Sequence, residues 1–436
     1  MVRSRLGSQM RLTSALLVWL AFAAATLAQQ PAPVAQAADE VTFNRDVAPI
    51  FNKHCVACHR PGQMAPMSLL THESARPWAR SIQRQVTART MPPWSADPGI
   101  GTWANDPSLS PSEIATISRW VEAGAPKGTP PAPEPPSFTD GWQIGTPDLV
   151  LAIPKPFSVP ATGLVDYQYI EIPTGLTEDR WIQAVEIRPT NRKAVHHALA
   201  FVKSPGLATP PPAGRGDGTS CNEDFCGDIE MHDARMGPIL AASAVGTNPE
   251  MYARGTAKLL RAGSIITLQV HYTPYGEAST DQIGVGLVFA KEPPTVQLKM
   301  VPFSKQGFTI PPRASDHAVE EYLEFKKDAT IWSIGPHAHL RAKSWRFELI
   351  DPDGKVHPLL SVPKFDFNWQ LVYRMVEPIP VRAGSRLHAV GVFDNSANNK
   401  SNPDPDAVVK WGTMTGDEML FASIVYSLTP PRPSGR

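Results

Sequence analysis

The chain has 436 residues, 41 basic and 41 acidic, and a formal net charge of zero. This length accommodates two or three domains, and the basic residues do not cluster, which argues against nucleic acid as a partner. Proline (46 residues) and glycine (30 residues) are plentiful. Helical periodicity is weak after residue 140, so we expect a β body with many turns.

Residues 1–37 have the features of a secretory signal peptide. Three arginines within the first eleven residues precede an apolar run over residues 12–28, and small residues follow it. The run is short for a membrane span, which favours a cleaved signal over an uncleaved anchor. We therefore expect an exported protein, periplasmic in a bacterium, without stable insertion into a membrane.

Residues 40–127 are predicted to be helical and compact. Val47 and Ile50 recur at helical spacing shortly before the first cysteine. A further helix should begin at Ser110, because Glu113 completes a capping box with it. These helices enclose the first motif that carries chemistry.

That motif is Cys55-Val56-Ala57-Cys58-His59, the attachment sequence of a c-type haem. The two thiols would form thioethers with the haem vinyl groups, and His59 would be the proximal iron ligand. A dithiol redox motif is the alternative. The export signal and the flanking helices favour haem.

The sixth iron ligand is expected to be Met91. It precedes Pro92, and a residue before proline is driven out of helical geometry, so its thioether could face the iron from an extended loop. Met64 and Met67 are competitors, and any of the three could be core packing. With this motif, residues 40–127 resemble a small class I cytochrome c domain suited to electron transfer.

A proline-rich linker follows over residues 128–140 and marks a domain boundary. Beyond it, short apolar or alternating runs broken by turn residues predict two β domains, over 141–294 and 295–436. Cys221 and Cys226 flank a short polar loop, and in an oxidising compartment a local disulfide is expected, with soft metal ligation as the alternative.

Five histidines and one methionine stand out in the β domains. His337 and His339 lie two apart in a predicted strand, so both imidazoles would share one face. His271 lies on the polar face of its predicted strand. Taken singly, each could be a solvated surface histidine. The other histidines have no partner at ligand spacing.

The pair His196 and His197 is harder to interpret. Neighbours on a flat strand point to opposite sides, so binding one ion needs a bend, a bulge, or different ring nitrogens. With Met419, the set suggests a three-histidine site and a His-His-Met site. Imidazole and thioether suit copper in both its oxidation states.

The order of these residues resembles that of the copper type II, ascorbate-dependent monooxygenases, which include peptidylglycine α-hydroxylating and dopamine β-monooxygenases. The resemblance covers roughly residues 141–430. The matching segments are Val195-His-His-Ala198, Val270-His-Tyr272, Pro336-His-Ala-His-Leu340 and Gly412-Thr-Met-Thr-Gly-Asp-Glu-Met419.

The resemblance implies two all-β sandwich, jelly-roll-like copper domains that face each other across a solvent cleft. With the small all-α cytochrome c domain expected before them, the fold would be multidomain. It assigns an electron-transfer copper to His196, His197 and His271. It assigns the catalytic, O2-binding copper to His337, His339 and Met419. The reaction would convert a C–H bond to an alcohol.

This chain departs from the amidating members of the family. Gly335 stands where they have an arginine that grips the substrate carboxylate, and Phe421 and Ser423 replace their Asn and Tyr after the methionine. Leu420 replaces a common cysteine, so the family's disulfide pattern does not transfer. Peptidylglycine is therefore not the expected substrate, and the pocket near Phe421 should be more apolar.

Together these observations predict an exported haem- and copper-dependent monooxygenase with two copper ions and one covalent haem c. Its expected partners are O2, a small molecule and an external electron donor. The alternative is a copper-binding protein for electron transfer, sensing or storage, without oxygenase activity.

Overall fold

The fold is that of a computed structural model, which describes residues 40–63, 65–138, 141–203, 205, 224–227, 238–244, 249–412 and 414–428. The expected signal peptide, Met64 and Cys221 lie outside the described residues. Within these ranges, no helix combines the length and apolarity that crossing a membrane requires.

The helical segment, residues 40–127, contains only short helices. Their bounds are η1 (Phe43–Val47), α1 (Ala48–His54), α2 (His72–Ala75), η2 (Arg76–Trp78), α3 (Ala79–Thr87) and α4 (Pro111–Glu122). The capping box predicted for α4 is confirmed: Glu113 N donates to Ser110 Oγ (3.2 Å), and Ser110 N donates to Glu113 Oε2 (2.8 Å). Phe43, Phe51 and Trp120 are buried at the centre of this segment.

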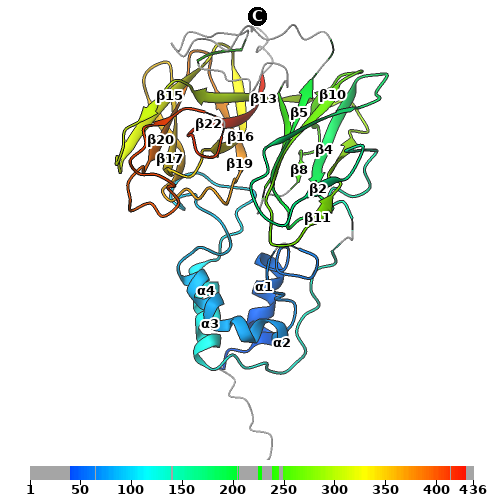
Figure 1. The fold of residues 1–436 in the computed structure, drawn as a ribbon. Coiled ribbons are helices and arrows are strands. Elements are labelled where there is room, and N and C mark those ends of the chain that lie inside the picture. Colours follow the sequence, from blue (N-terminus) through cyan, green and yellow to red (C-terminus); the bar gives the residue numbers. More distant parts are fainter. Residues whose placement is uncertain are drawn as a thin grey trace, which may run out of the picture.

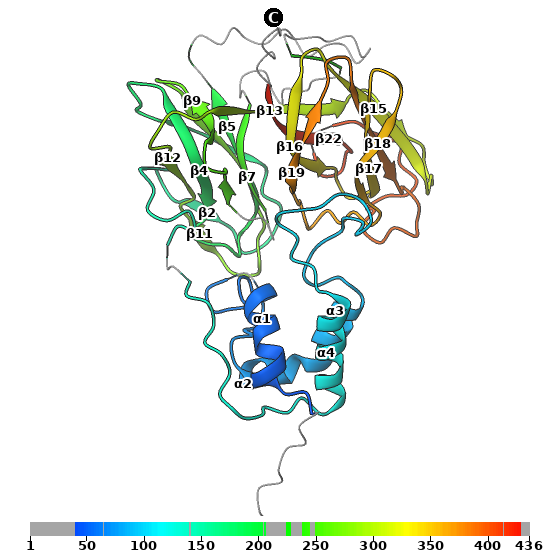
Figure 2. The same ribbon diagram turned by 180° about the vertical axis from the view of Figure 1, so that it is seen from behind.

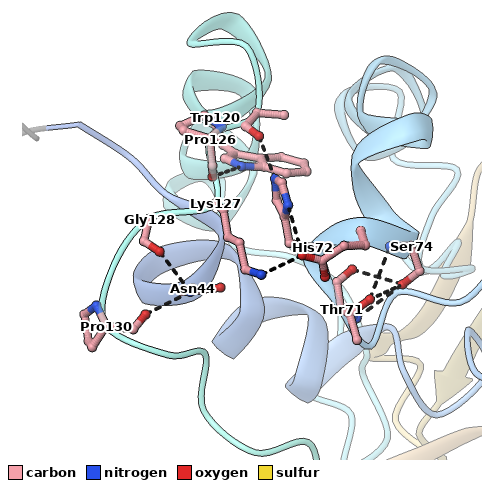
Figure 3. A network of polar contacts seen from close by, with 11 residues as sticks. Asn44, Thr71, His72, Ser74, Trp120, Pro126, Lys127, Gly128 and Pro130 are labelled. Atoms are coloured by element: carbon pink, nitrogen blue, oxygen red, sulfur yellow. Dashed lines mark hydrogen bonds and ion pairs between the residues drawn. The ribbon is translucent and has the colours of Figure 1, made fainter. Parts of the chain in front are cut away.

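A polar network fastens the chain after α4 to the first helices (Figure 3). Trp120 Nε1 donates to the carbonyl of Pro126 (3.0 Å), and Asn44 Nδ2 donates to the carbonyls of Gly128 (3.0 Å) and Pro130 (2.8 Å). The start of the expected linker is therefore held against the helices.

The first sandwich packs two sheets around one core. One sheet has the order β1 (Leu149–Ala152), β12 (Gly284–Phe289), β4 (Arg180–Arg188) and β9 (Thr256–Leu260), with β8 (Glu250–Met251) against β4. The other has the order β3 (Gln168–Pro173), β10 (Ile265–Tyr272), β5 (Val195–Lys203) and β7 (Ile239–Ala244). A small ribbon pairs β2 (Phe157–Val159) with β11 (Ser279–Asp281).

The second sandwich is built in the same way around its own core. One sheet has the order β13 (Val296–Lys305), β22 (Leu420–Leu428), β16 (Ala329–His337) and β19 (Tyr373–Val381). The other has the order β18 (Val356–Val362), β17 (Ala342–Ile350), β20 (Arg386–Phe393), β15 (His317–Phe325) and β6 (Phe225–Gly227). A short ribbon pairs β14 (Thr309–Ile310) with β21 (Val409–Lys410).

Strand β13 joins the two sandwiches. It pairs in parallel with β9 of the first and antiparallel with β22 of the second, so one continuous sheet runs through both. The sandwiches stand side by side, with the helical segment below both of them (Figure 1), and the view from behind shows the same arrangement (Figure 2). Strand β6 also connects the two sandwiches. It precedes β7 of the first sandwich in sequence but pairs with β15 of the second.

The expected fold class is wrong in its first part. The chain is mostly β, with 40% strand and 11% helix, and it has no N-terminal all-α cytochrome c domain, whereas the β-sandwich part agrees with the expectation. The reason lies between α3 and α4, where residues 88–110 form no helix.

That stretch leaves the helices and packs on the second sandwich. Trp103 forms a β-bridge with Met375, and the rings of Trp94 and Trp103 lie 4.8 and 5.4 Å from that of Tyr373. Asn105 Nδ2 donates to the carbonyl of Val372 (2.7 Å). This stretch of the helical segment therefore packs on the second sandwich, while the helices keep a core of their own.

Candidate metal and haem sites

His196, His197 and His271 converge at the end of the first sandwich. One ligand atom from each lies within 4.8 Å of the others. The pairing of β5 with β10 explains how neighbours in sequence can do this. His197 pairs with His271 and Val195 with Tyr272, which leaves His196 as the extra residue of a β-bulge.

The nitrogen atoms of this three-histidine site are arranged as a metal would require. Nδ1 of His196 lies 3.1 Å from Nδ1 of His197, and Nδ1 of His271 is buried without a hydrogen-bond partner. A buried ring nitrogen without a partner is costly unless something binds there. Burial lowers the pKa of each imidazole, that of His271 to about 4, so the rings are neutral and ready to bind a metal.

The His-His-Met site lies on β16 and just before β22. His337 is the last residue of β16, and His339 falls in the following loop, so the expected strand ends earlier than predicted. The rings of His337 and His339 are 5.3 Å apart and nearly perpendicular. Met419 is 1% exposed. The strand register places Phe421 opposite His337, which brings Met419 to this end of β22.

Each of these two histidines has its Nδ1 held by a hydrogen bond. His337 Nδ1 donates to Gln370 Oε1 (2.9 Å), and His339 Nδ1 donates to the carbonyl of Asp417 (3.1 Å). Partners of this kind fix the ring orientation of metal-binding histidines and leave Nε2 as the ligand atom.

Glu418 supports the loop that carries this site. Its buried carboxylate accepts the backbone N–H groups of His339 (2.9 Å), Arg341 (2.6 Å) and Met419 (3.3 Å). These N–H groups donate to the Glu418 carboxylate instead of to a neighbouring strand, and β16 accordingly ends at His337. Burial, opposed by these hydrogen bonds, raises the pKa of Glu418 to about 7.

Gly335 and Phe421 shape the neighbourhood of the site. A Cβ atom at Gly335 would lie 2.6 Å from Ser423 Oγ, so a side chain there would require Ser423 to shift. Phe421 is 5% exposed, and its ring lies 5.9 Å from that of His337. The side chains around Gly335 are therefore packed closely against the backbone at this position.

The two sites are neighbours rather than partners across a wide cleft. The ring of Phe367 lies 5.5 Å from that of His196 and 6.2 Å from that of His339. Burial lowers the pKa of His197 most, followed by the two other histidines of its site. His337 and His339 lower this pKa further. One aromatic side chain of the β18–β19 loop thus contacts a histidine of each candidate site.

Tyr167 closes another side of the three-histidine site. Its ring lies 4.8 Å from that of His271 and 5.7 Å from that of His197. Burial raises the pKa of its hydroxyl, and Thr415, which precedes Met419 in the second sandwich, opposes this rise. The side chain therefore joins the two sandwiches beside the histidines.

The haem motif begins where α1 ends. Cys55 and Cys58 are free thiols, the first half-buried and the second exposed. Burial raises the pKa of both, that of Cys55 to about 12. His59 Nδ1 donates to the carbonyl of Met67 (3.3 Å), which leaves Nε2 as a ligand atom. The backbone carbonyl of Met67 therefore lies on the Nδ1 side of His59.

A cavity of about 1120 Å³ connects this motif with the three-histidine site. Cys58, His59 and Met91 of the helical segment line it, and so do Arg192 and His196 of the first sandwich. Cofactor pockets typically measure roughly 300–1,000 Å³, so a haem would fit. We call this space the central cavity.

The structure gives the remaining histidines ordinary roles where it describes them. Both ring nitrogens of His54 and of His388 have hydrogen-bond partners. His72 Nε2 lies 2.9 Å from the carbonyl of Ala125, and His357 Nε2 lies 3.0 Å from Asp351 Oδ2. His232, which follows the cysteine loop, lies outside the described residues.

Sequence reasoning missed Gln370, Phe367 and Arg192. None of these side chains is a common metal ligand, and none belongs to a recognisable motif. All three lie in loops whose position depends on tertiary packing. Only the density of aromatic residues in Phe365-Asp-Phe367-Asn-Trp369 offers a signal within the sequence.

Comparisons with known proteins add little. No protein-family model and no curated protein matches the chain. Solved structures similar to parts of it include allantoicase from Saccharomyces cerevisiae (11% identity, TM-score 0.16, 54% of this chain and 78% of that one). Others are a second allantoicase (14%, 0.17, 56% and 83%) and Paenibacillus xanthan lyase (10%, 0.16, 69% and 28%). Likeness at this level carries no inference about activity.

Proposed function

We propose that this chain is an exported oxidoreductase that binds two copper ions and one covalent haem c and hydroxylates a C–H bond with O2. The observation that carries the proposal is the convergence of His196, His197 and His271, with a buried Nδ1 left unpartnered. Beside it lie two further oriented histidines and a buried thioether. These donor sets suit copper.

When bound, the copper ions would supply one-electron redox chemistry and O2 binding, and the haem would supply electrons. The residues of the chain have distinct tasks. Gln370 and the carbonyl of Asp417 orient the imidazoles of His337 and His339, while Glu418 fixes the loop. Phe421 keeps the surroundings of His337 apolar and restricts the access of water.

For the haem, the motif supplies two thiols, and the carbonyl of Met67 orients His59 with Nε2 free. Met67 and Met91 both line the central cavity, as do Cys58 and His196. We retain Met91 as the proposed sixth ligand because it precedes Pro92 in an extended loop.

A second function is favoured by one observation. Phe367 fills the space between His196 and His339, and His339 and Met419 are almost fully buried. A substrate would have to displace that ring. A copper protein for electron transfer, sensing or storage would have no such requirement.

Oxygen consumption separates the two functions. The full chain, loaded with copper and haem and supplied with a one-electron reductant, would be tested with a panel of small apolar substrates under ¹⁸O2. Hydroxylation consumes one O2, two electrons and two protons and forms one alcohol and one water. We expect one labelled oxygen atom in each product molecule. No labelled product from any substrate would favour the second function.

A further inference from the structure

Arg192 reaches from the first sandwich toward the haem motif. It lies in the loop between β4 and β5 and is half-buried. Its guanidinium has no hydrogen bond or ion pair within the part of the chain that the structure describes. Arg192 and Cys58 both line the central cavity, together with His196. The positive charge of Arg192 opposes the rise that burial causes in the pKa of Cys58, which agrees with this placement.

A short, ordered piece of chain connects Arg192 to the three-histidine site. Only three residues separate it from His196, and Ala194 is fully buried. The carbonyl of Ala194 accepts from Thr273 N (2.8 Å), and its N–H donates to the carbonyl of Asn191 (3.2 Å). Ala194, in the middle of this segment, is thus held by hydrogen bonds at both its N–H and its carbonyl group.

We propose that Arg192 is the contact through which an electron passes from the Cys58 edge of the haem to the three-histidine site. This inference rests on the proposed function, since it requires haem at Cys58 and copper at His196. In the step, ferrous haem loses one electron and becomes ferric, and Cu(II) gains it and becomes Cu(I). An external one-electron reductant restores the ferrous haem.

The charge of Arg192 and its position have opposite effects on the rate. A positive charge beside the haem favours the ferrous state, so removing it lowers the midpoint potential of the haem. A lower potential increases the driving force toward copper. If Arg192 acted through charge alone, its loss would speed the transfer. If it is the contact, its loss slows the transfer despite the larger driving force.

The test uses the full-length holoprotein. Spectroelectrochemistry of the copper-free form gives the midpoint potential, and flash photoreduction of the haem in the copper-loaded, anaerobic form gives the transfer rate. For Arg192→Gln we expect a lower potential and a several-fold slower transfer. Arg192→Lys keeps the charge and most of the reach, so both values should recover largely.

Arg60 provides the matched control. It also lowers the pKa of Cys58 and lines the central cavity, but its guanidinium is held by the carbonyls of Val56 and Ala57 and lies over the ring of Phe138, and it belongs to the helical segment rather than to the chain that leads to His196. Arg60→Gln should lower the potential without slowing the transfer.

Two outcomes would overturn the proposal in different ways. Transfer in Arg192→Gln that is as fast as in the unchanged chain, with haem and copper both bound, overturns this inference alone. An unchanged chain without covalent haem, or without copper at the three histidines, overturns it together with the proposed function. Haem and copper contents measured before any substitution tell the two cases apart.

Discussion

Replacement of Met419 by leucine is expected to abolish product formation and to lower the copper content from two ions per chain to one. Leucine keeps the volume of the methionine but lacks the thioether sulfur. Swaps of this kind usually cost less than about 1.5 kcal/mol in buried positions, so the fold should survive. Metal analysis, together with labelled-product formation, measures both effects.

Met375→Leu is the matched control for this substitution. Met375 is also buried in the second sandwich, at 8% exposure, but it faces the Trp103 bridge rather than the histidines. We expect it to retain two coppers and full turnover. If Met419→Leu kept both coppers and normal turnover, Met419 would not be a ligand.

Removal of both motif thiols, in the double variant Cys55→Ala and Cys58→Ala, is expected to eliminate covalent haem completely. Alanine cannot form the thioethers, so any remaining haem would be extracted when the chain is denatured. Copper binding should persist, because the histidines lie on the sandwiches. The visible spectrum of the denatured chain and its copper content measure these two expectations.

Met91→Leu serves as the comparison for the thiol variant. It should retain covalent haem, because both cysteines remain, but its midpoint potential should fall because a methionine ligand raises it. The absence of covalent haem in the unchanged, exported chain would contradict the interpretation of Cys55-Val56-Ala57-Cys58-His59 as an attachment motif.

The β part of the fold was predictable because strand periodicity and turn residues are local signals. The order of the strands was not. The parallel pairing of β13 with β9 and the antiparallel pairing of β6 with β15 both depend on contacts between distant segments. The stretch around Trp94 and Trp103 carries no local sign that it leaves the helices for the second sandwich, and this is why the predicted cytochrome c domain is wrong.

The candidate site divides in the same way. The histidines could be selected by residue type and spacing, and flat-strand geometry already required a bulge or bend at His196. Two other features depend on a loop whose sequence has no regular period. Phe367 of this loop contacts His196 and so links the two sites, and Gln370 orients His337. The role of Glu418 was hidden because its partners are backbone N–H groups, which sequence does not display.

The central claim is that haem, copper and O2 act in one electron path, and stopped-flow absorbance tests it most directly. Holoprotein with reduced haem would be mixed with oxygenated buffer, with and without copper, and with anaerobic buffer. We predict that rapid reoxidation of the haem requires copper and O2 together. Reoxidation at the same rate without copper would contradict the account.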